Sequence, residues 1–377
     1  MRISVLNKIV GSFTLFLLLM LVPTHAVAAS ATLLKAKQEA EARGYIFFAT
    51  HDEIVAMAKK EGKLKVSSGQ EPPTIKSLIN AFKQKYPFIT DVRVEEILGI
   101  EAYQRFILEM QVGQAKGWDI TFIPIDFAKE YPPYLMKHDI LGMARHGVLK
   151  IDPRMIHPVE RNIVGVTSSI RTVAYNRKLI SEDKVPAKYE NFLKPEFKGK
   201  KFALDIRPLG LGPLVPAWGL ERTLDFARKL TAQEPVWIRG ATRTHTAIVA
   251  GEYSLFLGSS FSSAERAMSK DLTGNLSYKI TEPVPTMIVD DASGIINTAD
   301  HPHAALLWFE FLASPEGQQI MDKYEPYEAS VFSPGSAAAK ATQGKELSVI
   351  NWDHFSKFQE YQGKISAAYG FPKADKK

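Results

Sequence analysis

The chain has 377 residues, and its 47 basic and 41 acidic residues give a formal net charge of +6. It contains no cysteine, which excludes a disulfide framework, and its composition of 45% hydrophobic and 23% charged residues is typical of a globular protein long enough for two domains. The basic residues are scattered and form no run with interleaved aromatics, which argues against a nucleic-acid partner.

Residues 1–29 predict a secretory signal. Two basic residues precede an apolar run from Ile9 to Val22, and small residues follow, with a cleavage site near Ala28 or Ala29. The run has about 14 residues, short of the roughly 20 that span a bilayer. We therefore expect a periplasmic protein, monomeric and without a membrane anchor.

Helix and strand alternate through the first part of the chain. Residues 30–59 predict a helical extension, with helices over 31–42 and 54–62, to which the sequence assigns no function. The apolar pattern then predicts strands over 64–67, 92–95 and 119–123, with helices over 74–86 and 101–114. This alternation indicates a mostly parallel sheet covered on both faces.

A second set of elements follows two extended runs at 164–169 and 172–176. Its expected strands are 201–205 and 253–257, and its expected helices are 220–229, 241–250 and 262–269. Later come two strong helices over 304–313 and 315–324, with Ser314 as the N-cap of the second and Pro315 at its first position. The pattern predicts a second α/β lobe.

Several stretches, in a consistent order, resemble one family. They are Glu61–Ser68, Trp118–Ile120, Thr172–Asn176, Val185–Pro186, Phe192–Lys200, Ala250–Tyr253, His301–Ala305 and Phe311–Gln318. Together they resemble the solute-binding proteins of ABC transporters with the type 2 periplasmic-binding fold, in the branch of ferric-ion, thiamine, polyamine and phosphonate binders. The resemblance covers most of the chain from about residue 60.

The resemblance implies an α/β protein of two lobes, with crossover hinge strands and a ligand cleft between them. Lobe 1 would hold residues 60–167 and 288–377, and lobe 2 would hold 168–287. The implied partners are a small solute and a membrane permease, with no cofactor. The same fold also serves as a ligand-sensing module, in which a receptor instead of a permease recognises the closed form. This use is the alternative.

Ligands in open α/β sheets gather at the carboxyl ends of strands, beside helix N-termini with unpaired N–H groups. Ser67, Ser68, Gly69 and Gln70 occupy such a place after the first strand, where their polar groups suit a ligand. A capped turn is the alternative interpretation.

A loop after the strand at 201–205 holds Asp205, Arg207 and Gly210, among glycines and prolines that fix its backbone. The guanidinium fork of Arg207 suits a carboxylate or phosphonate, which predicts a small anionic solute. A structural ion pair between Asp205 and Arg207 is the alternative.

Further candidates follow the later strands. Arg239, with Arg243 and His245, adds positive charge ahead of a helix, although solvation explains most such charges. Ser259 and Ser260 offer hydroxyls to an oxyanion, or Ser260 caps the next helix. 

Tyr175 lies near the lobe crossing, where the resemblance implies a ligand-contacting aromatic, and a packed hinge tyrosine is an equal interpretation. Ferric ion is the alternative ligand. Iron binders of the family carry adjacent tyrosines in the returning segment, whereas here Tyr324 and Tyr327 are separated by two residues.

An enzyme is disfavoured. Asp290 and Asp291 are adjacent, so on an extended chain their carboxylates point apart, and no nucleophile-elbow or zinc-protease motif occurs. His301 and His303 flank a proline without an evident third ligand, so we expect no metal site there. The sequence thus predicts the extracytoplasmic solute-binding component of an ABC importer.

Overall fold

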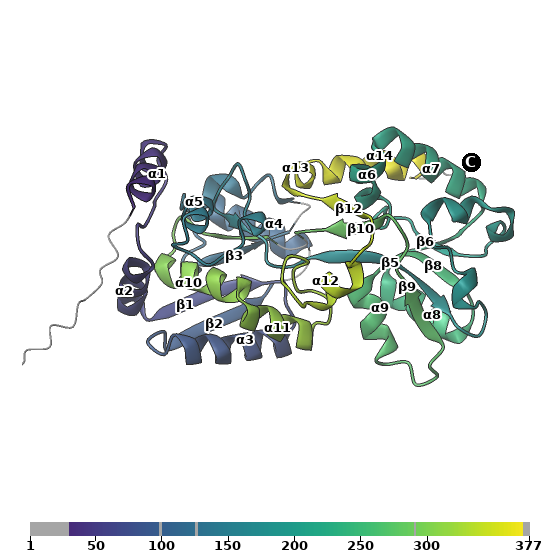
Figure 1. Cartoon of the computed structure of the whole chain (residues 1–377), viewed down its shortest axis with the longest axis horizontal. Helices are drawn as coiled ribbons and strands as arrows, with labels where there is room; N and C mark the ends of the chain where they lie inside the picture. Colours follow the sequence, from purple (N-terminus) through teal and green to yellow (C-terminus); the bar gives the residue numbers. More distant parts are fainter. Residues whose placement is uncertain (1–29, 98–99, 125–126, 290–291, 372–377) are drawn as a thin grey trace, which may run out of the picture.

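A computed structural model describes residues 30–97, 100–124, 127–289 and 292–371. The expected signal segment and Asp290–Asp291 lie outside these residues. Two β-sheets, each with its own helices, lie side by side along the long axis of the molecule (Figure 1). We call the part that contains β1 lobe 1 and the part that contains β8 lobe 2. The predicted two-lobed α/β class is confirmed.

Lobe 1 contains a five-stranded sheet in the order β2-β1-β3-β11-β4. β1 runs parallel to β2 and β3, and β11 runs antiparallel to β3 and β4. Its strands are β1 (Lys63–Ser68), β2 (Asp91–Glu96), β3 (Ile120–Ile123), β4 (Ile163–Val164) and β11 (Ala292–Ile295). The strands predicted over 64–67, 92–95 and 119–123 are therefore confirmed.

The helices of lobe 1 are α3 (Pro72–Lys85), α4 (Ile100–Gln111), α5 (Ile140–Arg145), α10 (Pro302–Ala313) and α11 (Pro315–Tyr324). α10 is buried from Ala304 to Leu312, because it is apolar all round and lies in the lobe 1 core. The break between α10 and α11 falls at Ser314, whose Oγ accepts a hydrogen bond from Gly317 N, as the sequence predicts for an N-cap.

Lobe 2 contains a seven-stranded sheet in the order β12-β10-β5-β8-β6-β7, with β9 paired to β5. β5 is antiparallel to β8, β9 and β10, while β6 is parallel to β7 and β8. The strands are β5 (Ser169–Asn176), β6 (Ala203–Asp205), β7 (Val236–Ile238), β8 (Leu255–Ser260), β9 (Leu276–Lys279), β10 (Val284–Met287) and β12 (Leu347–Ile350). The carboxyl ends of β6, β7 and β8 therefore meet at one edge.

The remaining helices of the second half are α6 (Val215–Trp218), α7 (Leu220–Ala232), α8 (Ala241–Ala250), α9 (Phe261–Met268), α12 (Ala337–Thr342), α13 (Trp352–Phe355) and α14 (Phe358–Ala368). The helices predicted over 220–229, 241–250 and 262–269 correspond to α7, α8 and α9. None of the helices within the described ranges combines the length and apolar character that a bilayer crossing requires.

The chain passes from lobe 1 to lobe 2 between β4 and β5, and it returns between β10 and β11. The expected boundaries at 167/168 and 287/288 fall in these passages. Ser168 is fully buried there, and its Oγ donates to Ile288 O at 3.1 Å and accepts from Val331 N at 3.1 Å. One hydroxyl therefore ties together both passages and the segment after α11.

The C-terminal segment differs from the expected division, which assigned all of 288–377 to lobe 1. β11, α10 and α11 do lie in lobe 1, but β12 pairs with β10 in the lobe 2 sheet. α14 packs on α7, where Phe358, Tyr361 and Ile365 join the lobe 2 core. The reason is that α14 carries an apolar face that lobe 2 buries (Figure 1).

The N-terminal extension consists of α1 (Ala31–Ala42) and α2 (His51–Glu61), and α2 packs along α10 of lobe 1. The Glu61 carboxylate accepts from Ala304 N at 2.8 Å and lies 2.6 Å from His303 Nδ1. It therefore caps the start of α10. His301 Nδ1 lies 3.0 Å from a different carboxylate, that of Asp119. Each of the two histidines therefore contacts its own carboxylate, and they do not form a pair of metal ligands.

Candidate functional site

The loop at the carboxyl end of β1 uses its hydroxyls within lobe 1. Ser67 is 2% exposed, and its Oγ accepts a hydrogen bond from Phe122 N at 2.8 Å. Ser68 Oγ accepts from Gln70 N at 3.1 Å and closes the turn around Gly69. The adjoining cavity, of about 30 Å³, has room for about two water molecules. These contacts match the capped-turn interpretation of the loop.

The start of α3 is unsuited to an anion. Pro72 and Pro73 have no N–H group to offer, and Glu71 before them brings a negative charge. The Glu71 carboxylate accepts from Arg266 Nη1 of α9 at 2.5 Å. This ion pair links lobe 1 to lobe 2. The start of α3 therefore lacks the cluster of free N–H groups that a helix N-terminus ordinarily supplies.

Asp205 organises the corresponding edge of lobe 2. Its Oδ1 accepts from Arg207 N at 2.9 Å and from Arg207 Nε at 3.1 Å, and its Oδ2 accepts from Arg207 Nη2 at 2.8 Å. Oδ2 also accepts from Gly240 N at 3.2 Å, across from β7. One carboxylate therefore holds the ends of β6 and β7 together, and the structural ion pair considered as an alternative is present.

Arg207 keeps free hydrogen-bonding capacity despite this pair. Its side chain is 45% exposed, against 11% for Asp205. The hydrogen bond to Asp205 raises the pKa of Arg207 from its already high value, so the group stays cationic. A guanidinium has five N–H donors, and two of them suffice for the Asp205 carboxylate. The remaining donors face away from it.

Two glycines bring the β6 and β8 ends into contact. A methyl group at Gly210 would lie 2.6 Å from Gly258 Cα, and Gly258 has φ +82°, which favours glycine. The backbone of the loop after Asp205 thus lies directly against the end of β8. Only glycine at position 210 permits this approach.

We expect Gly210→Ala to lower the free energy of unfolding by about 1–3 kcal/mol, because the added methyl overlaps backbone that has little room to move. Urea unfolding followed by circular dichroism measures the change. Gly363→Ala in α14 is the matched control, since a Cβ there has no atom within 4 Å and alanine favours a helix by about 0.5–1 kcal/mol. Equal stability of Gly210→Ala and the wild type would show that the two loops separate freely.

Arg239 and Arg243 extend the positive charge along this edge. Both are exposed, and they line a groove of about 520 Å³ along β7 and α8 together with Thr244 and Tyr253. With Arg207, three guanidinium groups lie near adjacent strand ends, Asp205 compensates one of them, and Glu252 lines the same groove as the other two. Three arginines against two carboxylates leave a net charge of +1 beside exposed polar groups.

Ser259 and Ser260 at the end of β8 are placed differently from each other. Ser259 is fully buried, and its Oγ lies 2.8 Å from His245 Nε2, so it cannot reach a ligand at the surface. Ser260 is half-buried, and its Oγ contacts Ser262 Oγ at 3.0 Å at the start of α9. His245 was expected to add positive charge, but burial lowers its pKa to about 4 and leaves it neutral.

Tyr175 lies in the core of lobe 2, not at its surface. The residue is 2% exposed near the carboxyl end of β5, where it pairs with Leu255 of β8 and Ser277 of β9. This position matches the packed interpretation, and a ligand between the lobes does not meet its side chain.

The tyrosines of the iron alternative do not converge. Tyr324 is 40% exposed on lobe 1, whereas the Tyr327 ring stacks on Phe261 at a centroid distance of 3.9 Å. Burial, followed by the charge of Glu265, raises the pKa of Tyr327 to about 12, which disfavours a phenolate. Across the described ranges, no group of three or more His, Cys, Asp or Glu side chains is arranged to hold a metal ion.

Comparison with known proteins gives a family match. The model of the family described as bacterial extracellular solute-binding proteins matches residues 149–357, more than half of the chain. The matched stretch contains all of lobe 2 from β5 to β10 and reaches α13. No curated protein matches the chain in sequence.

Solved structures share the fold at low sequence identity. The ferric iron-binding protein A of Mannheimia haemolytica, in an open conformation, has a TM-score of 0.64 and 16% identity, covering 81% of this chain and 98% of its own. A Trichodesmium protein in complex with iron and citrate has a TM-score of 0.63 and 17% identity, covering 81% and 99%. The substrate-binding protein of an ABC transporter from Agrobacterium tumefaciens has a TM-score of 0.57 and 16% identity, covering 81% and 95%.

Proposed function

The chain belongs to the bacterial extracellular solute-binding proteins, and from this premise we propose that it captures a small anionic solute between its lobes for an ABC importer. Proteins of this family bind solutes and do not transform them, which confirms the prediction that the chain is not an enzyme. The membrane permease is its proposed partner, and the closed form is the state that the permease would recognise.

The positive edge of lobe 2 carries this proposal. Arg207 is held by Asp205 in a fixed direction and retains free donors, and Arg239 and Arg243 follow the adjacent strand end. A guanidinium fork pairs with a carboxylate or phosphonate through two parallel hydrogen bonds. Closure would remove water from this pair and strengthen the attraction. Of the lobe 1 strand ends that the structure describes, the loop after β1 offers no comparable cluster of donors, so lobe 2 would bind the anion first.

Ferric ion remains the second candidate, since two of the similar structures are of iron-binding or iron-bound proteins. At 16–17% identity these similarities establish the fold and not the ligand. A phenolate site would need the Tyr327 proton to leave, and the raised pKa of Tyr327 opposes that. A bound iron–anion complex would satisfy both candidates, because its anion could pair with the arginines.

A thermal-shift screen tests the proposal. The mature protein is stripped of bound ligand by unfolding and refolding, and it is then mixed with phosphonates, carboxylates, polyamines, thiamine or ferric citrate. A ligand that binds only the native state raises the melting temperature. A shift with carboxylates or phosphonates supports the anion site, whereas a shift only with polyamines or thiamine contradicts it. No shift with any compound would favour the sensing-module alternative.

For the ligand that the screen selects, we expect Arg207→Ala to weaken binding about thirtyfold, because a charge-assisted pair worth about 2 kcal/mol is lost. Isothermal titration calorimetry measures the dissociation constant. Arg222→Ala is the matched control, since Arg222 of α7 pairs with Glu190 and covers Trp218, away from the strand ends. If both variants bind like the wild type, Arg207 does not contact the solute.

A further inference from the structure

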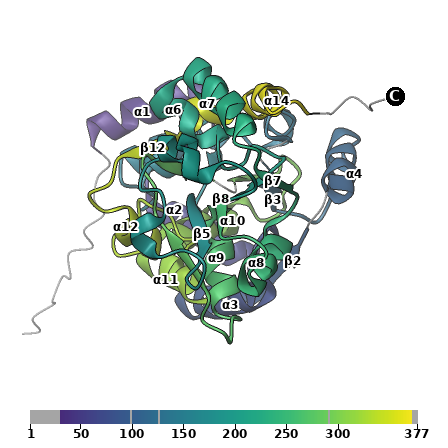
Figure 2. The same cartoon turned by 90° about the vertical axis from the view of Figure 1, so that its right-hand side faces the viewer.

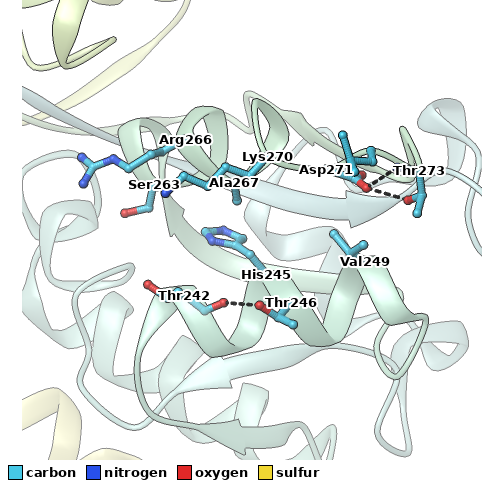
Figure 3. A pocket seen from close by; sticks show the side chains of 11 residues that line it. Thr242, His245, Thr246, Val249, Ser263, Arg266, Ala267, Lys270, Asp271 and Thr273 are labelled. Carbon is cyan, nitrogen blue, oxygen red and sulfur yellow. Dashed lines mark hydrogen bonds between the residues drawn. The ribbon is translucent and has the colours of Figure 1, made fainter.

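A separate pocket of about 420 Å³ lies between α8 and α9 (Figure 3). Thr242 and Thr246 line it from α8, Ser263 and Ala267 line it from α9, and the loop at 270–273 closes one end. All of these residues belong to lobe 2. The volume falls within the range of roughly 300–1,000 Å³ that is usual for small-molecule sites.

His245 forms the floor of this pocket. The residue is 2% exposed, and its ring points from α8 toward α9, into the pocket (Figure 3). His245 Nε2 lies 2.8 Å from Ser259 Oγ, and the Ser259 hydroxyl has a second acceptor in Ser260 O at 3.3 Å. When that hydroxyl donates to Ser260 O, Nε2–H donates to Ser259 Oγ and Nδ1 carries the lone pair of the ring.

The Nδ1 lone pair of His245 has no hydrogen-bond partner among the residues that the structure describes. Burial lowers the pKa of His245 to about 4, so the ring is neutral at pH 7 and Nδ1 remains an acceptor. An acceptor that faces an open pocket can be met by water or by a donor group of a ligand. The floor of the pocket thus offers a hydrogen-bond acceptor to a molecule with an N–H or O–H group.

The rim of the pocket favours a negative group. Lys270 has no ion-pair partner within the described ranges, and Arg266 lies at the other end, paired with Glu71. The Asp271 carboxylate is directed away from a ligand, since it accepts from Thr273 N at 2.9 Å and Leu276 N at 2.8 Å. Lys270 is therefore freer to attract a ligand than Asp271 or the paired Arg266.

We propose that the pocket between α8 and α9 is a second ligand site, for a small carboxylate that also bears a hydroxyl or ammonium group. The donor group would bind His245 Nδ1, and the carboxylate would lie toward Lys270. Because Arg266 joins this pocket to Glu71 of lobe 1, occupancy would be sensed by the contact between the lobes. This site is independent of the proposed anion site, since Arg207 does not line it.

Nitrogen-15 NMR of the stripped full mature protein tests the proposal. L-Lactate and L-serine are the probes, and propionate, which has the carboxylate but no hydroxyl or ammonium group, is the control. We expect the Nε2–H tautomer of His245 in the free protein, and a shift of its Nδ1 signal on titration with lactate or serine but not with propionate. An Nδ1–H tautomer, an equal response to propionate, or no response to either probe at millimolar concentration would overturn the proposal.

His245→Gln separates the two roles of the ring. The glutamine amide takes the position of Nε2 and can still donate to Ser259, but no acceptor replaces Nδ1. We expect this variant to fold with an unchanged circular dichroism spectrum and to bind the probes at least about tenfold more weakly, as expected for one lost hydrogen bond. Arg207→Ala should leave the response of the His245 Nδ1 signal to the probes unchanged. Unweakened probe binding in His245→Gln would show that the probes bind elsewhere, whatever the fate of the anion site.

Discussion

Replacing Asp139 with alanine is expected to lower the free energy of unfolding by about 3–5 kcal/mol, because it leaves the Arg161 guanidinium buried without its counter-charge. The Asp139 side chain is 2% exposed and that of Arg161 is 15% exposed. Arg161 Nε donates to Oδ1 at 2.8 Å and Nη2 donates to Oδ2 at 2.8 Å. Oδ1 also accepts from Gly142 N at 2.7 Å and caps α5.

The backbone at Arg161 adds to this cost. Its φ is +62°, a left-handed conformation that is unfavourable for a residue with a side chain, and its carbonyl accepts from Leu141 N. The ion pair with Asp139 holds the residue in this conformation. Without this ion pair, both α5 and the turn before β4 lose a contact. The loss of stability should therefore affect lobe 1 beyond the site of the substitution.

Asp152→Ala is the control for the Asp139 variant. Asp152 pairs with Arg154 and also begins a short helical turn, but the Arg154 side chain is 61% exposed. Solvent screens such a pair, so we expect a loss below about 1 kcal/mol. Chemical denaturation of both variants at pH 7 measures the difference. Equal losses of unfolding free energy in the two variants would mean that the Arg161 guanidinium becomes hydrated when Asp139 is removed.

The elements of lobe 1 were predictable because their signal is local. Ile75, Leu78 and Phe82 form an apolar stripe in the sequence, and the same three side chains are buried on α3. The ends of the helix were less certain: the stripe predicted 74–86, whereas Pro72 and Pro73 begin the helix two residues earlier. The apolar periodicity indicates which residues face the core, but it does not locate the first turn of the helix. Prolines are tolerated in that turn, so Pro72 and Pro73 did not exclude a helix there.

The position of Tyr175 was not predictable from its neighbours. Its segment was expected to be extended, and it does form part of β5. β5 is buried on nearly all of its length because β8, β9 and β10 pair with it, and all three come much later in the chain. Only these long-range pairings determine that the ring is packed and not exposed to a ligand.

The candidate site shows the same division between near and distant partners. Asp205 and Arg207 are two residues apart, so the sequence could raise their ion pair as an alternative. Glu71 and Arg266 are 195 residues apart, and nothing in either segment indicates the other. His245 was likewise expected to be an exposed cation. Its burial depends on the packing of α8 against β8, which the residues next to it in the sequence do not indicate.

A buried carboxylate couples the N-terminal extension to lobe 1 and makes the stability of the protein depend on pH. Glu310 of α10 is 4% exposed, and its carboxylate contacts His51 Nε2 at 2.8 Å and accepts from Lys150 N at 2.7 Å. The hydrogen bond that His51 donates to Glu310 is the largest cause that raises the pKa of His51 above its ordinary 6.5. Burial alone would raise the pKa of Glu310, but the bonds from His51 and Lys150 outweigh it and hold this pKa below its ordinary 4.5.

The two shifts define a pH window. Since the folded state raises the pKa of His51, its contribution is complete below pH 6.5 and is lost as the pH rises through the raised value. Since the folded state lowers the pKa of Glu310, its contribution is complete above pH 4.5 and is lost as the pH falls through the lowered value. The pair therefore stabilises the protein most between pH 4.5 and 6.5.

We expect Glu310→Gln to lower the free energy of unfolding by about 3 kcal/mol inside this window, because charge-assisted bonds to a buried group are lost. The loss should shrink at alkaline pH, where His51 is neutral in the wild type as well. Urea unfolding at several pH values measures it. His51→Gln is the companion variant: it should remove the decline on the alkaline side and keep the decline in acid, because Lys150 N still binds the Glu310 carboxylate. A loss in Glu310→Gln that is the same at every pH would show that His51 is not charged when α2 packs against α10.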